Sequence, residues 1–531
     1  MTLPSSDRHV VVVGAGAGGL AAAIDLARQG LQVTLLEAGP APGGKLYQHS
    51  VDGVGIDSGP TVFTMRWVFE GLFNAAGARL EDYLQLEPLG LLARHAWAAG
   101  GQLDLHAEAA RSAEAIGQFS GPAEARRFLA FCEQARKVYE TLEAPYIRSS
   151  RPDAVSLTRA IGLGGTLMLS SLGPFRDLWR ALSRHFHDPR LQQLFGRYAT
   201  YCGSSPLEAP ATLMLVAHVE MLGVWAVQGG MIRLAQALAT LATQQGVALR
   251  CNSRVQSIQT RNGRISGVVL DDGQQINADA VVFNGDVNAL AQGLLGTGAR
   301  GAVPPVPQSE RSLSAVTWSV RTQAAGFPLI RHNVFFDDDY ASEFTDIFSH
   351  RRLPRKPTVY LCAQDRTDSG IASDPLERML ILVNAPALGD LDRPSALSAE
   401  ELSACEQRAM TLMRRCGLEV NRHAAITSDG AIRDDAPLSE LGGIRSTPID
   451  FERRFAATGG ALYGRASHGW MSAFAKPDAS TAIEGLYVAG GSAHPGAGVP
   501  MATLSGRLAA ASLMGWLTQG RRQVRVTLPR T

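Results

Sequence analysis

Residues 9 to 45 read "HVVVVGAGAGGLAAAIDLARQGLQVTLLEAGPAPGGK". The stretch begins with an apolar run, Val10 to Val13, which is typical of a buried parallel strand. Glycines follow in the pattern GxGxxG. Residues 18 to 29 then have the apolar spacing of a helix, and residues 31 to 36 are predicted to form a second strand. This order predicts a Rossmann-type βαβ unit and therefore an α/β fold.

The three glycines of the turn each have a physical role in such a unit. Gly14 permits the tight turn, Gly16 lets the backbone approach a pyrophosphate, and Gly19 lets the helix pack closely on the strand. Glu37 ends the second strand, where an acid is needed to bind both ribose hydroxyls. A glutamate there disfavours NADP, because it repels the 2′-phosphate. The segment therefore predicts a dinucleotide site.

Residues 14 to 44 as a whole resemble the longer fingerprint of FAD oxidoreductases, "GxGxxGLxxAxxLxxxGxxVxxxExxxxxGG", with matches at Leu20, Ala23, Leu26, Gly30, Val33 and Glu37. The glycine pair of that fingerprint corresponds to Gly43 and Gly44, with Lys45 directly after them. The resemblance implies that FAD is the cofactor and that these three residues help to bind it.

Composition excludes several classes of function. Lys and Arg total 50 against 49 Asp and Glu, so a nucleic-acid partner is not expected. The six cysteines form no CxxC pair, which argues against a metal site and favours a reducing, cytoplasmic location. No apolar run reaches the roughly 20 residues of a spanning helix. The longest uncharged stretch, residues 160 to 175, is instead a candidate for contact with a membrane surface.

The remaining patterns predict a discontinuous domain organisation. We expect an FAD-binding domain from residues 1–100, 225–300 and 455–531. Residues 101–224 read as a helical region, and residues 301–454 read as a strand-rich substrate domain. Within these ranges, "VALRCNSRVQSIQT" and "RISGVVLDD" are predicted as paired β runs, and residues 420 to 446 as a loop.

A second glycine-rich turn lies in "GLYVAGGSAHPGAGVPMATLSG", residues 485 to 506. An apolar strand ends at Gly490 and Gly491, and Pro500 suits the first turn of a helix. The free N–H groups and the positive end of that helix stabilise negative charge, which reduced flavin develops. We therefore expect this turn to hold the flavin ring, with Gly490 and Gly491 leaving room for it.

These motifs, together with "TGGALYGRASHGW" at residues 458 to 470, resemble the carotenoid desaturase family. "GVPMATLSGRLAA" is similar to its hydroxyneurosporene branch, the 1-hydroxycarotenoid 3,4-desaturases. The resemblance implies an amine-oxidase-like fold, in which a mixed sheet-plus-helix substrate domain is inserted into the FAD-binding domain. It also implies FAD-dependent desaturation of a long apolar carotenoid, with Val255 at the adenine edge. Gly491 replaces the Asp that many flavoproteins place on the ribityl chain, which leaves that contact unassigned.

Candidate acid/base residues are few. His468 and His494 lie beside glycines in the family motifs, and Glu220 lies in the apolar stretch "LMLVAHVEMLGVWAV". A buried acid usually has a partner or a raised pKa. Arg465 is a further candidate for contact with flavin or substrate. We expect a polar group in the substrate tunnel to form a hydrogen bond with a substrate hydroxyl. The candidates are Glu220, His218, Arg197 and His468.

Other functions remain open at this point. A phytoene-type desaturase, a carotenoid isomerase and a non-catalytic isoprenoid-binding protein like the Rab GDP-dissociation inhibitors share the resemblance. Because a polyene dissolves only in lipid, we expect the protein on the cytoplasmic membrane of a bacterium. Residues 160 to 175 and Arg521, Arg522, Arg525 and Arg530 would form the two attachment signals. Oxygen or a membrane quinone would accept the electrons.

Overall fold

The computed structural model describes residues 8–150, 153–171, 177–368, 370–372, 374–392, 395–421, 438, 442–519 and 525–530. A five-stranded parallel sheet collects strands from three distant parts of the chain. In sheet order the strands are β10 (Ala248–Arg250), β2 (Gln32–Leu36), β1 (His9–Val13), β14 (Ala280–Phe283) and β21 (Leu486–Val488). The valines of β1 are buried, and every pairing in the sheet is parallel. The predicted βαβ unit is confirmed.

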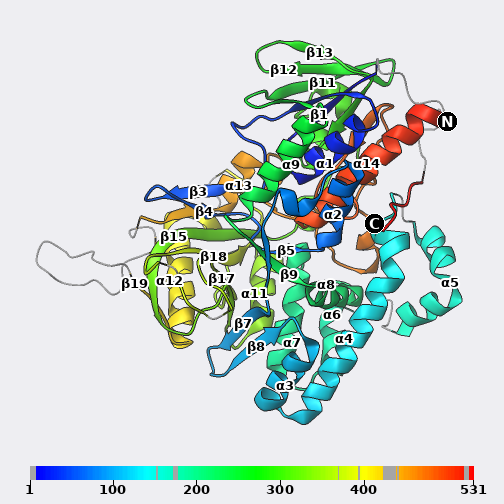
Figure 1. Ribbon diagram of the computed structural model, residues 1–531. Coiled ribbons are helices and arrows are strands. Elements are labelled where there is room, and N and C mark those ends of the chain that lie inside the picture. Colours follow the sequence, from blue (N-terminus) through cyan, green and yellow to red (C-terminus); the bar gives the residue numbers. More distant parts are fainter. Residues whose placement is uncertain are drawn as a thin grey trace, which may run out of the picture.

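Two helices from opposite ends of the sequence cover one side of this sheet. Helix α1 (Ala17–Ala27) follows β1, and helix α14 (Val499–Gln519) follows β21; the two lie side by side in blue and red in Figure 1. Their backbones approach so closely that a Cβ on Gly506 would lie 1.9 Å from the Gly18 carbonyl oxygen. Glycine at both positions therefore allows the N-terminal and C-terminal units to pack as one.

A larger mixed sheet forms the second layer. Its path runs β19 (Leu418–Asn421), β15 (Ser314–Gly326), β18 (Glu377–Ala385), β17 (Val359–Ala363), β16 (His332–Phe336), β7 (Leu91–Trp97) and β8 (Gln102–His106). Helix α12 (Ala399–Arg415) packs on it. Strands β7 and β8 belong to this sheet although their sequence lies in or beside the first range assigned to the FAD-binding domain. Four strands of this sheet, β15 to β18, lie within the range 301–454 that was predicted to be strand-rich.

A separate region of the molecule is built mainly from helices. They are α3 (Ala109–Ser120), α4 (Pro122–Leu142), α5 (Ala154–Ser171), α6 (Leu178–His185), α7 (Pro189–Gly196) and α8 (Leu215–Met221). Helix α5 lies at the periphery, far from the large sheet (Figure 1), and it is kinked at Gly162. Helices therefore predominate between residues 109 and 221.

Two local predictions were wrong. "VALRCNSRVQSIQT" is not one β run, because β10 joins the parallel sheet while β11 (Val255–Arg261) pairs with β12 (Arg264–Leu270). Between them, the Ser253 N–H donates to the Glu37 carbonyl and bends the chain. The predicted loop at 420–446 contains β20 (Ile444–Ser446), which pairs with β15. Residues 422–437 and 439–441 of that loop lie outside the described residues.

Candidate cofactor and substrate site

A continuous cavity of about 1130 Å³ connects the glycine turns with the helical region and the large sheet. It begins at the turn after β1, passes Lys45 and the start of α14, and continues between α5, α8 and β15–β18. Its volume exceeds the roughly 300–1,000 Å³ of an ordinary ligand pocket. The cavity therefore has room for a cofactor and for part of a long substrate.

The first glycine turn is tight because its neighbours leave no space for side chains. Gly14 has φ +100°. A Cβ on Gly16 would lie 2.9 Å from Asn284 Oδ1, and one on Gly19 would lie 2.0 Å from the Gly14 carbonyl oxygen. Gly14 and Gly16 also line the cavity, whereas Gly19 packs the helix on the strand. This is a cradle that backbone alone forms, as a bound pyrophosphate requires.

Asn284 is a central residue that the sequence analysis missed. It follows β14, and its Nδ2 donates to the Ala489 carbonyl over 3.0 Å. The same nitrogen would lie 2.7 Å from a Cβ on Gly18 or on Gly490. Asn284 thus joins the N-terminal turn to the C-terminal one. In the sequence it is visible only as the first residue of an Asn-Gly turn.

Glu37 lies at the carboxyl end of β2 and lines the cavity. Its carboxylate accepts the Ala15 N–H over 2.8 Å and the Gly39 N–H over 2.7 Å. The Gly43 N–H donates to the Ala15 carbonyl over 2.9 Å, so the second glycine pair packs on the first turn. Gly43 and Gly44 have φ of +139° and +59°. Val255 lines the cavity as well.

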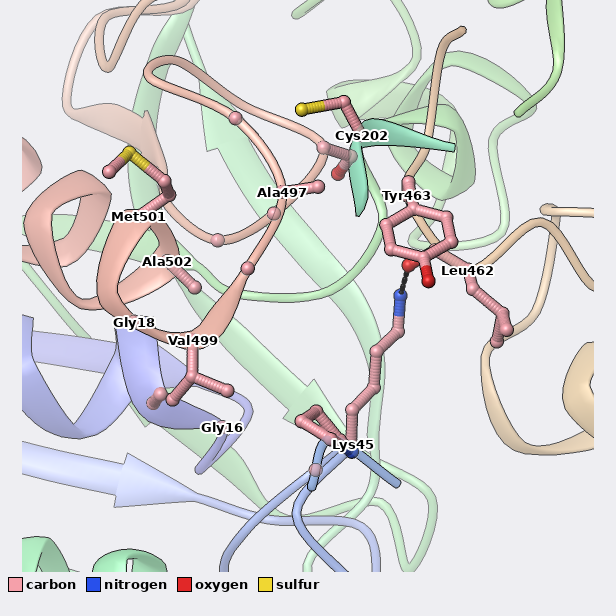
Figure 2. Close-up of a pocket in the computed structure, with 18 of the residues that line it drawn as sticks. Gly16, Gly18, Lys45, Cys202, Leu462, Tyr463, Ala497, Val499, Met501 and Ala502 are labelled. Carbon is pink, nitrogen blue, oxygen red and sulfur yellow. Dashed lines mark hydrogen bonds between the residues drawn. The ribbon is translucent and has the colours of Figure 1, made fainter. Parts of the chain in front are cut away.

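Lys45 extends along the cavity wall toward Tyr463, as Figure 2 shows, and its Nζ donates to the Leu462 carbonyl. Burial lowers the pKa of Lys45, and the nearby Asp286 carboxylate opposes that shift. Burial raises the pKa of Asp286, while Lys45 and Lys476 pull it down. Lys476 donates to the Arg465 carbonyl over 3.1 Å. A buried group of two amines and one carboxyl therefore borders the cavity beside the glycine turns.

The C-terminal turn brings α14 to the cavity. Residues 499 to 502, at the N-terminal end of this helix, line the cavity, and Figure 2 shows Val499, Met501 and Ala502 across from Lys45. Gly490 has φ +114°, and its N–H donates to Ser505 Oγ over 3.1 Å. Gly491 also lines the cavity, and a Cβ there would lie 3.7 Å from the nearest atom, Ala497 Cα. The packing of the protein around position 491 therefore leaves room for a side chain larger than that of glycine.

The structure does not bring the two candidate histidines to the cavity. His468 Nε2 accepts the Ser205 N–H over 3.0 Å, and its Nδ1 lies 3.2 Å from Glu208 Oε2. His494 Nε2 donates to the Tyr146 carbonyl over 2.9 Å, and burial lowers the pKa of His494 to about 4. Neither is among the described residues that line the cavity. Their ring nitrogens hold turns together, which argues against a role in proton transfer.

Glu220 is the candidate acid that does face the cavity. Its two oxygens accept hydrogen bonds from Tyr198 over 2.6 Å and from Tyr201 over 2.9 Å. Burial raises the pKa of Glu220, while the two tyrosines and Arg197 lower it. Arg465 instead forms an ion pair with Glu310, and His218 packs its ring on Tyr139.

The residues at the glycine turns fit FAD. The cradle excludes side chains, an acid lies where a ribose binds, and a helix N-terminus faces the same space. Across the described residues, no cluster of His, Cys, Asp and Glu suits a metal ion.

Comparison with known proteins identifies the class. Residues 17–320 match the model for flavin containing amine oxidoreductases, so the chain belongs to this flavoenzyme family. The fold agrees: the chain superposes on putrescine oxidase with a TM-score of 0.57 at 15% identity, covering 96% of this chain and 99% of the oxidase. Cyclohexylamine oxidase from Brevibacterium oxydans gives 0.55 at 16% identity, covering 97% and 100%.

Within this class the chain is an FAD-dependent oxidoreductase of the carotenoid desaturase type. It is 56% identical to the hydroxyneurosporene desaturase of Rubrivivax gelatinosus, over 99% of this chain and 97% of that protein. The hydroxyneurosporene desaturase of Cereibacter sphaeroides is 43% identical over 95% and 97%. A 4,4'-diapolycopene oxygenase from Methylomonas is 32% identical over the same shares. The resemblance noted in the sequence is confirmed.

Proposed function

We propose that this protein removes two hydrogens across the C3–C4 bond of a 1-hydroxycarotenoid. The observation that carries this proposal is the identity of 56% with a hydroxyneurosporene desaturase across almost the whole chain. Bound FAD supplies the oxidising power, because a flavin accepts a hydride from an allylic carbon while the neighbouring proton leaves. The electrons would then pass to oxygen or to a membrane quinone.

The residues that would hold FAD are those of the two glycine turns and the elements beside them. They are Gly14, Gly16, Gly19, Glu37, Gly43, Gly44, Lys45, Val255, Gly490 and Gly491. The α14 N-terminus supplies a positive end without a charged side chain. Lys45 would orient the ring region, since its amine is held by the Leu462 carbonyl.

The remainder of the cavity suits an apolar chain. Its wall includes the aliphatic side chains of Leu142, Ile147, Leu157, Leu169, Leu213, Leu215, Val216 and Val219. Such a wall excludes water and binds a polyene by burial of apolar surface. Because the conjugated chain delocalises positive charge, water or a weak base suffices for the departing proton.

Product analysis tests the proposal. Under anaerobic conditions, the purified holoenzyme should convert a 1-hydroxycarotenoid to the product with one more conjugated double bond, and flavin absorbance should fall in step. Its deoxy analogue should react much more slowly. Equal conversion of both would make the enzyme a general carotene desaturase, and rearrangement without loss of flavin absorbance would make it an isomerase.

Attachment to a membrane surface is a second proposal, and it rests on α5. None of the described helices is long and apolar enough to cross a bilayer. Yet Val155, Leu163 and Leu167 on α5 are 70%, 78% and 62% exposed, while Leu157 and Leu169 of the same helix line the cavity. We propose that α5 lies in the lipid interface and that the substrate enters beside it.

The C-terminal segment adds positive charge to the same side of the molecule. Residues 525–530 run beside residues 148–150, because the Leu528 N–H donates to the Arg148 carbonyl and the Ser150 N–H to the Val526 carbonyl. Arg530 is half-exposed and pairs with Glu143. Arg521 and Arg522 lie outside the described residues. An apolar helix with basic residues nearby is a two-signal attachment.

Liposome flotation tests this proposal. The double variant Leu163→Asp/Leu167→Asp should bind anionic vesicles at least about tenfold more weakly, because each buried leucine is worth roughly 1.5–3 kcal/mol. Ile371→Asp is the control, since Ile371 is 71% exposed elsewhere on the molecule. Equal flotation of the double variant and the wild type would exclude α5 as the anchor.

A further inference from the structure

A polar cluster interrupts the apolar wall of the cavity. It consists of Arg197, Tyr201, Glu220 and Tyr340, all of which line the cavity. Arg197 Nη2 donates to the Tyr201 hydroxyl over 2.6 Å, and that hydroxyl donates to Glu220 Oε1 over 2.9 Å. The guanidinium also lies 4.9 Å from the centre of the Tyr201 ring. A cation and an acid are thus held in fixed positions inside an apolar tunnel.

One end of the helix that carries part of the cluster lies beside the Lys45 region of the cavity. The short helix η3 (Arg197–Cys202) carries two members of the cluster and ends beside Tyr463, which Figure 2 shows next to Lys45 and Cys202. The residue after η3, Gly203, touches the Tyr463 ring, because a Cβ there would lie 2.6 Å from it. Burial raises the pKa of Tyr463 to about 12, and the Arg197 charge opposes that shift. The end of η3 is therefore next to the proposed flavin region.

Two donors of the cluster are not satisfied by the protein. Among the described residues, neither the Tyr340 hydroxyl nor Arg197 Nε has a hydrogen-bond partner, and both atoms are buried. Tyr340 is only 5% exposed. Its ring is fixed by edge contacts with Phe336 and Phe344. Leaving such a buried donor unpaired costs about 1–3 kcal/mol, so a ligand oxygen at this point would recover that cost.

We propose that the polar cluster binds the tertiary hydroxyl on C1 of the substrate, with Tyr340 and Arg197 as donors to its oxygen. This inference rests on the proposed function. In a 1-hydroxycarotenoid a single carbon, C2, separates the hydroxyl-bearing carbon from C3. The hydroxyl must therefore lie close to the bond that is desaturated. Helix η3 begins at Arg197 in the cluster and ends at Cys202, beside Tyr463 and Lys45, so we place the cluster on the flavin side of the substrate path.

The cluster accounts for a preference that apolar contacts cannot provide. Two polyenes that differ by one hydroxyl bury nearly the same apolar area, and a purely apolar pocket discriminates by only about 10²-fold, against the hydroxylated polyene. A site with buried donors leaves those donors unpaired when the deoxy analogue binds. Such sites discriminate by about 10⁴-fold or more. Of the earlier candidates, Arg197 and Glu220 belong to this site, whereas His218 and His468 do not line the cavity.

The test compares the wild-type holoenzyme with Tyr340→Phe. This substitution removes a hydroxyl that holds no protein group, so the fold should be kept. We expect kcat/KM for the 1-hydroxycarotenoid to fall about tenfold to a hundredfold, and kcat/KM for the deoxy analogue to stay unchanged. Binding affinity can be measured by the quenching of tryptophan fluorescence. The affinity for the 1-hydroxycarotenoid should fall in the variant, and the affinity for the deoxy analogue should stay unchanged. Tyr139→Phe is the matched control, because Tyr139 is 1% exposed but does not line the cavity.

Arg197→Met gives an independent measurement. It should abolish most of the preference for the hydroxylated substrate. If Tyr340→Phe lowers kcat/KM for both substrates by the same factor, the Tyr340 hydroxyl has only a structural role and the inference is wrong. If the wild type prefers the hydroxylated substrate and both variants keep that preference, the inference is wrong while the proposed function stands. If the wild type uses both substrates equally, the proposed substrate class fails, and this inference fails with it.

Discussion

The Gly16→Val protein is expected to purify with at least about tenfold less flavin than the wild type, and therefore without its yellow colour. Gly16 lines the cavity, and a Cβ there would lie 2.9 Å from Asn284 Oδ1. The valine methyl groups would have to displace Asn284 or enter the cradle, and either change removes the close backbone approach that a pyrophosphate needs. Flavin absorbance per mole of protein measures the loss.

A matched control separates loss of the cofactor from loss of the fold. Gly301→Val adds the same side chain at an exposed glycine whose Cβ would meet no atom within 4 Å. It should keep its full flavin content. Circular dichroism should show native helix content in both variants. A Gly16→Val protein with the wild-type flavin content would mean that the N-terminal turn is not the pyrophosphate site.

Asp25→Ala should lower the free energy of unfolding by about 3–5 kcal/mol. Asp25 on α1 and Arg507 on α14 form a buried ion pair, with Arg507 Nε 3.0 Å from Asp25 Oδ2. The two residues are 3% and 7% exposed. Removing the carboxylate leaves the Arg507 charge buried without its partner, at the contact where α14 is held in place. The midpoint of urea unfolding measures the effect.

The second partner of Asp25 supplies the control. Arg28 Nε lies 2.6 Å from Asp25 Oδ1, but its side chain is 31% exposed, so Arg28→Ala should cost at most about 1 kcal/mol. The double variant Asp25→Leu/Arg507→Met replaces the pair by apolar side chains and should recover most of the lost stability. Equal effects of Asp25→Ala and Arg28→Ala would show that the buried pair does not hold the two helices together.

The parts of the site that could be predicted from sequence are those in which adjacent residues act together. The turn from Val13 to Gly19 is visible because strand, glycines and helix follow one another within a few residues. The C-terminal turn is visible for the same reason. In both turns the backbone conformation has a positive φ that favours glycine, at Gly14 and at Gly490. The glycines therefore make both turns recognisable in the sequence.

The positions of the His468 and His494 side chains could not be predicted from the sequence. His468 and His494 lie in glycine-rich motifs, and proximity to such motifs suggested a place in the site. The direction in which a side chain points depends on what packs around it, and both rings hydrogen-bond to the backbone of other segments. Strand β20 was missed for a related reason, because it forms only by pairing with β15.

Local spacing was sufficient to predict the βαβ unit and the family, and it also predicts the dinucleotide site, because each of these depends on residues that are near one another in the chain. The tertiary structure was needed to place Asn284 against both glycine turns and to bring Arg197, Glu220 and Tyr340 to the wall of one cavity. These residues come from separate elements, and no spacing in the sequence records how such elements pack. The proposed recognition of the substrate therefore depends on the packing, whereas the proposed cofactor site depends largely on residues within two short segments.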